Sequence, residues 1–144
     1  MHALGTHLLV ELHGCDPDKL KHVDVVRDIM VSAAQACKAT VLDAAFHEFN
    51  PFGVSGIVVI AESHLSIHTW PEYRYAALDI FTCGNAIKPQ EGVEYAALQF
   101  GCATPSIVEV KRGVMPGATR RLPHKLSADR AAKASRRPLA AVPS

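Results

Sequence analysis

The chain has 144 residues, of which 49% are hydrophobic and 20% are charged, and this balance is typical of one globular domain with a small core. Its formal net charge of +1 gives no global attraction to nucleic acid or to membranes, and we expect neither as a partner. No run approaches the roughly 18 consecutive apolar residues of a membrane helix, which excludes a helical membrane span.

The first 61 residues predict a strand, a helix and two further strands. Residues 6–12 are apolar and partly branched and predict a strand. Asp16 and Pro17 then predict a helix start, because Asp is a preferred N-cap and Pro is tolerated at the first helical position. Apolar residues at helical spacing continue this one helix to Cys37.

Two strands are predicted on either side of a turn at residues 50–53. Residues 39–49 form the first of them. The second covers 54–61 and contains the uninterrupted apolar run Ile57–Ile60, which predicts a buried strand.

Residues 64–70 and 73–83 alternate in polarity, as expected of strands with two different faces. The first strand places four polar or aromatic side chains on one face, namely those of His64, Ser66, His68 and Trp70. The second places Asp79, Phe81 and Cys83 on one face. The two strands therefore concentrate reactive side chains in a short stretch of the chain.

The C-terminal third predicts a helix, a strand and a basic tail. Residues 89–100 have a helical pattern that stops at Gly101, and 106–110 form a last strand. With strands outnumbering helices, we expect an α+β fold, a two-layer sandwich in which an antiparallel sheet has helices packed on one face.

The charges divide the chain at about residue 115. Residues 1–115 contain eight Lys and Arg against thirteen Asp and Glu, a balance of −5, whereas 116–144 contain seven against one, a balance of +6. The second segment is rich in Arg, Ala, Ser and Pro. We expect a folded domain over 1–115 and a disordered basic tail over 116–144.

The four cysteines, at positions 15, 37, 83 and 102, are widely spaced and form no C-x-x-C pair. This spacing gives no signal for a zinc ribbon or a thioredoxin-type site. The N-terminus has no basic stretch followed by an apolar run, so we expect a cytoplasmic protein with free thiols.

Taken singly, the reactive residues of 62–83 have ordinary explanations, such as a turn hydroxyl for Ser63 or a buried apolar role for Cys83. Their combination is more specific. Residues 61–72, Ala-Glu-Ser-His-Leu-Ser-Ile-His-Thr-Trp-Pro-Glu, resemble the processing-site motif of the short prokaryotic, pyruvoyl-dependent S-adenosylmethionine decarboxylases. Residues 81–84 resemble that family's second motif, and 5–8 and 52–56 also look like family segments.

The resemblance implies that the chain cuts itself between Glu62 and Ser63. Ser63 would become a covalent pyruvoyl group that forms a Schiff base with the substrate, with no diffusible cofactor and no metal. His68 would be the base for the elimination step, since imidazole titrates near neutrality. Ser55 would stabilise the acyl-shift intermediate, and Cys83 would be the proton donor in decarboxylation.

The substrate implied by the resemblance is S-adenosylmethionine, and its decarboxylated product would be the aminopropyl donor of spermidine and polyamine synthesis. Trp70 and Phe49 are candidates to stack on the adenine or the sulfonium. Glu72 is the candidate for the ribose hydroxyls. Leu65 is a candidate for the wall of the pocket.

The mature enzyme would consist of a β chain, residues 1–62, and an α chain, residues 63–144. Small members of the family form dimers of αβ units with sites built from both protomers, and we expect the same here. Two alternatives remain open. The same scaffold serves pyruvoyl-dependent arginine or ornithine decarboxylases, and an uncleaved regulatory subunit could bind a nucleoside, or a metal through His64, His68 and Cys83.

Overall fold

The computed structural model describes residues 2–117, 119–123 and 125–135. It contains six strands: β1 (Ala3–His13), β2 (Val41–Glu48), β3 (Val54–Ile60), β4 (Ser63–Trp70), β5 (Tyr75–Cys83) and β6 (Ser106–Val114). The α-helices are α1 (Pro17–Leu20), α2 (Val23–Ala36), α3 (Pro89–Phe100) and α4 (Ala128–Ser135), and a 3-10 helix, η1, covers Pro71–Tyr73. None of the described helices is both long and apolar enough to cross a membrane.

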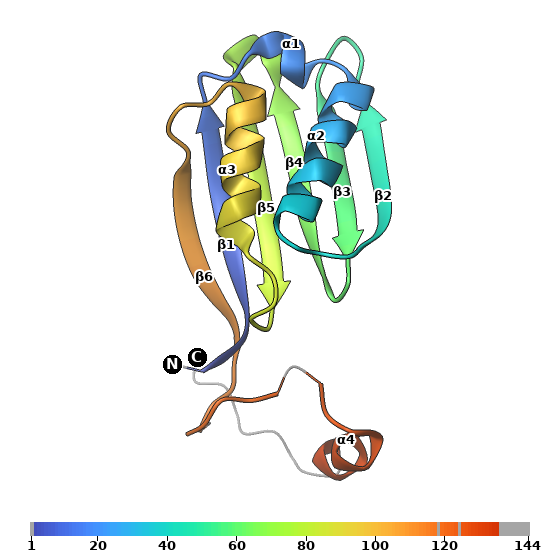
Figure 1. Cartoon of the computed structure of the whole chain (residues 1–144), viewed down its shortest axis with the longest axis vertical. Coiled ribbons are helices and arrows are strands. Elements are labelled where there is room, and N and C mark those ends of the chain that lie inside the picture. Colours follow the sequence, from blue (N-terminus) through green and yellow to red (C-terminus); the bar gives the residue numbers. More distant parts are fainter. Residues whose placement is uncertain (1, 118, 124, 136–144) are drawn as a thin grey trace.

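The six strands form one antiparallel sheet in the order β2-β3-β4-β5-β1-β6. Helices α2 and α3 lie side by side across one face of this sheet, with α1 at its upper end (Figure 1). No helix of the described residues covers the opposite face. The predicted α+β two-layer sandwich is therefore confirmed.

The core lies between the sheet and the helices. It is built from the inward-facing half of each alternating strand and from the apolar stripes of α2 and α3. Its largest fully buried members include Leu8, Leu12, Leu20, Met30, Ile60, Leu65, Ile67, Ile80 and Phe100. All four cysteines are free, as predicted, and three of them are buried.

The predicted helix over 16–37 is wrong in one respect, because the chain breaks it into α1 and α2. Asp16 caps α1 and Pro17 opens it, as predicted. At the break, the Oγ1 of Thr69 donates a hydrogen bond of 2.9 Å to the carbonyl of Leu20. The amide of Val23 donates one of 2.8 Å to Glu48 Oε1. Side chains from two distant segments thus replace the helical bonds lost at the break.

The prediction that 54–61 forms a fully buried strand is also wrong. Ile57 and Val59 are 36% and 38% exposed, whereas Val58 and Ile60 are buried. The difference arises because helices cover only one face of the sheet. The run is uniformly apolar even though one of its two faces is open.

The region after residue 115 contains a helix that the sequence did not predict, α4, which lies away from the sheet (Figure 1). Residues 136–144 of the predicted tail lie outside the described residues. The division into a domain over 1–115 and a tail stays a prediction.

Helices α2 and α3 approach closely at Gly92. A Cβ at this position would lie 2.2 Å from Cys37 Sγ and 3.0 Å from the carbonyl oxygen of Ala33. On the exposed side of a helix, a Gly-to-Ala change raises the free energy of unfolding by up to about 1 kcal/mol. Overpacking a core lowers it by about 1–3 kcal/mol. We expect Gly92→Ala to lower the urea midpoint of unfolding, while Gln99→Ala on the exposed side of α3 leaves it nearly unchanged. A midpoint for Gly92→Ala at or above that of the natural chain would contradict this packing.

Candidate active site

The turn between β3 and β4 holds the predicted cleavage site. Ile60 pairs with Ser63, so Ala61 and Glu62 form a two-residue turn. Glu62 has a φ of 67°, in the left-handed region, which costs a non-glycine residue about 1–2 kcal/mol. The Oγ of Ser63 is buried and has no hydrogen-bond partner among the described residues. An unpaired buried hydroxyl costs about 1–3 kcal/mol, and this one directly follows a strained residue.

Cys83 lies at the same end of the sheet. His64 pairs with Phe81, and continuing this antiparallel register by two places brings Cys83 beside Glu62. Burial raises the pKa of the Cys83 thiol, the charge of Glu62 raises it further, and the charge of Lys125 lowers it in part. The net pKa is raised, so the thiol keeps its proton at neutral pH. A protonated thiol is suited to act as an acid.

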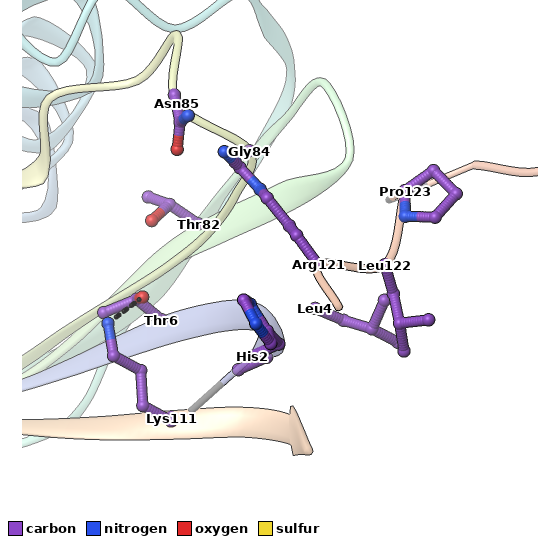
Figure 2. A pocket seen from close by; sticks show the side chains of 12 residues that line it. His2, Leu4, Thr6, Thr82, Gly84, Asn85, Lys111, Arg121, Leu122 and Pro123 are labelled. Atoms are coloured by element: carbon purple, nitrogen blue, oxygen red, sulfur yellow. Dashed lines mark hydrogen bonds between the residues drawn. The ribbon is translucent and has the colours of Figure 1, made fainter. Parts of the chain in front are cut away.

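A pocket of about 430 Å³ lies at this end of the sheet (Figure 2). Thr82 and Gly84, which flank Cys83, line it together with Lys111 and Arg121. Lys111 Nζ donates a hydrogen bond of 3.0 Å to Thr6 Oγ1 in the pocket wall. Cys83 itself is not among the lining residues. The pocket therefore adjoins the cysteine without enclosing its thiol.

A second group of predicted residues lies at the other end of the same strands. Ser55 pairs with His68 across β3 and β4, and Ser55 Oγ lies 2.7 Å from His68 Nδ1. Trp70 stacks on Tyr75, with ring centroids 5.3 Å apart. The Tyr75 hydroxyl donates a hydrogen bond to Glu11, and burial together with this carboxylate raises the pKa of Tyr75 to about 12.

The structure therefore separates the predicted catalytic residues into two groups within one chain. Ser63 and Cys83 belong to one end of the strands, and Ser55 and His68 to the other. His68 follows Ser63 by five residues on β4, a span of about 16 Å along a strand. Within one chain, His68 and Ser63 therefore lie far apart along β4.

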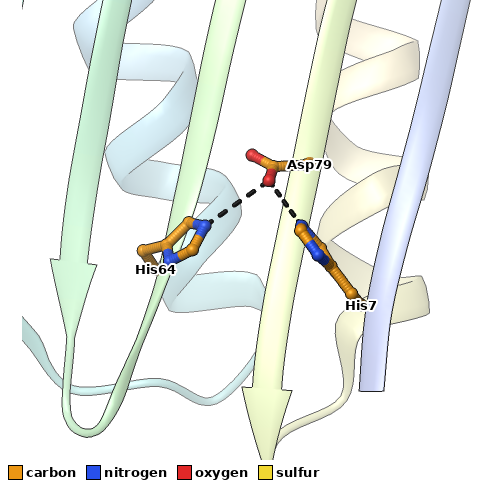
Figure 3. A group of neighbouring side chains, drawn as sticks. All are labelled: His7, His64 and Asp79. Carbon is orange, nitrogen blue, oxygen red and sulfur yellow. Dashed lines mark hydrogen bonds and ion pairs between the residues drawn. The ribbon is translucent and has the colours of Figure 1, made fainter. Parts of the chain in front are cut away.

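A network of polar side chains that the sequence analysis did not assemble lies between the two groups. His7 Nε2 is 2.5 Å from Asp79 Oδ2, and His64 Nε2 is 3.4 Å from the same oxygen (Figure 3). Ser66 Oγ donates to the other carboxylate oxygen. Arg112 lies 3.1 Å from His7 Nδ1. Face alternation had placed Asp79, His64 and Ser66 correctly, but only the register of β1 brings His7 to them.

The contacts of His7 define its tautomer. A guanidinium can only donate hydrogen bonds, so the Nδ1 of His7 accepts from Arg112 and its Nε2 carries the proton given to Asp79. His7, His64 and Asp79 have ligand atoms within 4.8 Å of one another, as a metal site requires. The protonated Nε2 favours a hydrogen-bond network instead. His68, from the metal set considered above, is not part of this group and pairs with Ser55.

The lowered pKa of Asp79 links this network to the stability of the fold. Burial raises its pKa, but the hydrogen bonds from Ser66 and His7 and the electrostatic attraction of the His64 and His7 rings outweigh burial and lower the pKa below its ordinary value near 3.8. Because the folded-state pKa is lowered, the ionised carboxylate stabilises the fold fully at pH values above the unfolded-state pKa. This stabilisation is lost as the pH falls through the folded-state pKa.

We expect Asp79→Asn to lower the free energy of unfolding at pH 7 by about 1–3 kcal/mol, because Ser66 and His7 lose a charged acceptor. The difference should begin to shrink below about pH 4, where the unfolded chain takes up its proton, and should be lost as the pH falls through the lower folded-state pKa. Urea unfolding at pH 7 and at pH 3.5 measures both values. A difference that does not change with pH would contradict the ionised role of Asp79.

Comparison with known proteins connects this geometry to a family. Residues 6–113 match the family model described as S-adenosylmethionine decarboxylase. The S-adenosylmethionine decarboxylase proenzyme of Thermodesulfovibrio yellowstonii is 56% identical over 126 residues, which are 88% of this chain and 93% of that protein. The proenzyme of the same name from Caldanaerobacter subterraneus subsp. tengcongensis is 55% identical over 114 residues, covering 79% of this chain and 92% of the relative.

A solved structure agrees. The adenosylmethionine decarboxylase of Aquifex aeolicus superposes with a TM-score of 0.74 at 30% identity, and covers 84% of this chain and 100% of its own. The chain belongs to the S-adenosylmethionine decarboxylase family. The resemblance seen in residues 61–72 and 81–84 is therefore confirmed, and the whole tail, 116–144, lies beyond the match to the family model, which ends at residue 113.

The residues predicted to contact substrate in this S-adenosylmethionine decarboxylase homologue lie in different environments. Trp70 and Phe49 are 40% and 48% exposed and offer aromatic surface, while Glu72 is exposed in η1. Leu65 is fully buried and belongs to the core beneath the helices. Its side chain does not line the open face, because Leu65 lies on the helix-facing side of β4.

Proposed function

We propose that this chain is a self-processing, pyruvoyl-dependent decarboxylase of S-adenosylmethionine that cuts itself between Glu62 and Ser63. The observation that carries the proposal is the Ser63 hydroxyl, which is buried without a partner among the described residues and directly follows the strained Glu62. Fixed, unpaired hydroxyls are expensive to maintain, and such groups are concentrated where reactivity is required. The family membership of the chain supports the same assignment.

The cleavage chemistry follows from these two residues. The Ser63 hydroxyl attacks the carbonyl carbon of Glu62, and the Glu62 acyl group moves from the amide nitrogen to the serine oxygen as an ester. A base removes the Cα proton of Ser63, and the ester leaves as the carboxylate of Glu62. The remaining dehydroalanine tautomerises and hydrolyses, which releases ammonia and leaves a pyruvoyl group at residue 63. A pre-oriented hydroxyl is essential, since peptide bonds otherwise react slowly.

The separated residue groups support a site shared between two copies of the chain. In one copy Ser63 and Cys83 lie at one end of the strands, and Ser55 and His68 at the other. Two copies that meet face to face in opposite directions would bring the Ser55–His68 pair of one copy to the strand end of the other that holds Ser63 and Cys83. A twofold axis would create two equal sites in this way.

The open face of the sheet has the composition of a contact surface. It carries large apolar side chains that are 36–58% exposed on four different strands, namely Leu9, Ile57, Val59, Trp70, Val108 and Val110. An apolar surface of this kind on a globular protein is a mark of association. We therefore propose a dimer of αβ units formed through this face.

In the mature enzyme the pyruvoyl group at residue 63 would supply the electron sink that decarboxylation of an amino acid requires. Cys83, whose raised pKa keeps the thiol protonated, would deliver a proton to the substrate α-carbon. Trp70 and Phe49 would stack on the adenine or the sulfonium, and Glu72 would accept hydrogen bonds from the ribose. The decarboxylated product is the aminopropyl donor of polyamine synthesis.

Substrate identity is tested by supplying S-adenosylmethionine, arginine and ornithine, each labelled at the carboxyl carbon, and counting released CO₂. We expect release from S-adenosylmethionine alone, with a raised KM in Glu72→Gln because the ribose contact loses its charge. Release from arginine or ornithine would reassign the substrate. Ligand binding by an uncut chain without CO₂ release would instead indicate a regulatory subunit.

A further inference from the structure

The basic segment after residue 115 lies against the cleavage end of the sheet. Arg121, Leu122 and Pro123 form part of the pocket wall that also contains Thr82 and Gly84. The Arg121 side chain extends toward Gly84 and Asn85 (Figure 2), and it makes no hydrogen bond or ion pair with another described residue. The segment is therefore seated next to Cys83, with cationic side chains directed at this end.

Lys125 of the same segment contacts the cleavage turn. Its Nζ lies 3.6 Å from Glu62 Oε1, and the two side chains are 72% and 47% exposed. An exposed pair of this kind contributes about 0–1 kcal/mol in an uncut chain. The wider charge distribution favours the contact, since residues 1–115 have a balance of −5 and 116–144 one of +6. The pair therefore adds little to the stability of the uncut chain.

Cleavage would change the charge and the covalent attachment of Glu62, the residue that Lys125 contacts. Before the cut, Glu62 carries one carboxylate and is held by its peptide bonds in the left-handed turn. After the cut, Glu62 is a chain end with two carboxylates, and the link that closed the turn onto β4 is gone. The cut removes this covalent hold on the end, and the extra negative charge would lie beside Cys83 and the incoming substrate carboxylate.

We propose that Lys125 is a positioning residue that holds the cleaved Glu62 end next to Cys83 and offsets its charge, with Arg121 lining the same end of the sheet. The inference rests on the proposed self-cleavage. The same Lys125 charge that holds the chain end lowers the pKa of the Cys83 thiol, whereas Glu62 raises it. Lys125 therefore contacts the Glu62 end of the 1–62 chain and also influences the Cys83 thiol of the 63–144 chain.

Carboxypeptidase digestion of the mature enzyme measures directly how accessible the C-terminal end at Glu62 is. The rate at which residues are trimmed from the 1–62 chain is followed by mass spectrometry, and trimming from Ser144 serves as the internal measure of protease activity. We expect Lys125→Glu to speed trimming from Glu62 about fivefold or more, the range expected for losing a short-range ion pair and adding repulsion. Lys125→Arg should restore the natural rate.

Arg130→Glu is the matched control, because it changes the net charge of the segment equally at a residue of α4, whose backbone amide donates a hydrogen bond to Ser127 Oγ. Raising the salt from about 0.05 M to about 1 M should speed trimming of the natural enzyme, since screening shortens the range of the attraction. The salt dependence can be measured on the natural enzyme, without any substitution.

The alkylation rate of Cys83 as a function of pH gives a second readout. Removing Lys125 should raise the thiol pKa and move the midpoint to higher pH in Lys125→Gln and Lys125→Glu, but not in Arg130→Glu. Cut chains with equal trimming rates and equal midpoints would overturn this proposal alone. A natural chain that stays uncut would overturn both this proposal and the proposed self-cleavage.

Discussion

His68→Ala chains are expected to stay uncut when produced alone and to be cut when they assemble with Ser63→Ala chains. Each variant lacks one residue of the shared site. In a mixed dimer the intact Ser63 of one copy meets the intact Ser55–His68 pair of the other, so one complete site forms. With random 1:1 pairing in a twofold dimer, about half of the His68→Ala chains should be cut. Denaturing mass spectrometry of the co-expressed mixture gives the fraction.

The control for this experiment is a mixture of Ser55→Ala and His68→Ala chains. Ser55 and His68 lie 2.7 Å apart in one group, so no pairing of these two variants restores a complete group. The mixture should remain uncut, apart from any residual activity of either variant alone. If the Ser63→Ala and His68→Ala mixture also stays uncut, although it forms dimers, the shared site is wrong and the reaction would have to run within one chain.

Cys83→Ala is expected to leave self-cleavage intact and to lower decarboxylation by about 10²–10⁴-fold, the usual contribution of a positioned acid. Cys83 lies beside Glu62 in the sheet register, and its thiol is protonated at neutral pH. Without this acid, protonation at the wrong carbon should consume the pyruvoyl group, so the mass of the 63–144 chain should change during turnover. CO₂ release and the mass of this chain, followed together, measure both effects.

The pH dependence of the natural enzyme provides the complementary evidence. A proton donor is active below its pKa, so the rate of proton delivery should fall as the pH rises through the pKa of Cys83. Because that pKa is raised, the fall should occur at higher pH than for an ordinary cysteine. A Cys83→Ala enzyme with natural turnover and an unchanged pH profile would exclude Cys83 as the donor.

Much of the fold could be predicted because polarity in this chain alternates with the pleat of its strands. The alternation of residues 64–70 and 73–83 correctly separated the open face from the core, including Asp79 and Cys83 on the open side. The helix over 89–100 and its stop at Gly101, which has a φ of 80°, were also correct. Strand alternation and a glycine helix stop depend on residues that are near one another in sequence, so they could be predicted without knowing the fold.

The errors arise where distant segments decide the local structure. Thr69 and Glu48 divide the predicted first helix, and neither lies near the break in sequence. The apolar run at Ile57–Ile60 could not reveal that only one face of β3 is covered. The sequence had placed a serine, a histidine and a cysteine in one short stretch, but Ser63 and His68 are five positions apart on the extended strand β4, which separates them.

The intact mass of the purified natural protein, measured under denaturing conditions beside Ser63→Ala, tests the central claim most directly. The account predicts two chains split between Glu62 and Ser63 in the natural protein, with the 63–144 chain lacking its amine nitrogen and carrying a carbonyl in its place. Ser63→Ala should give one chain of 144 residues. A single uncut chain in both samples, with the fold intact by circular dichroism, would contradict the account.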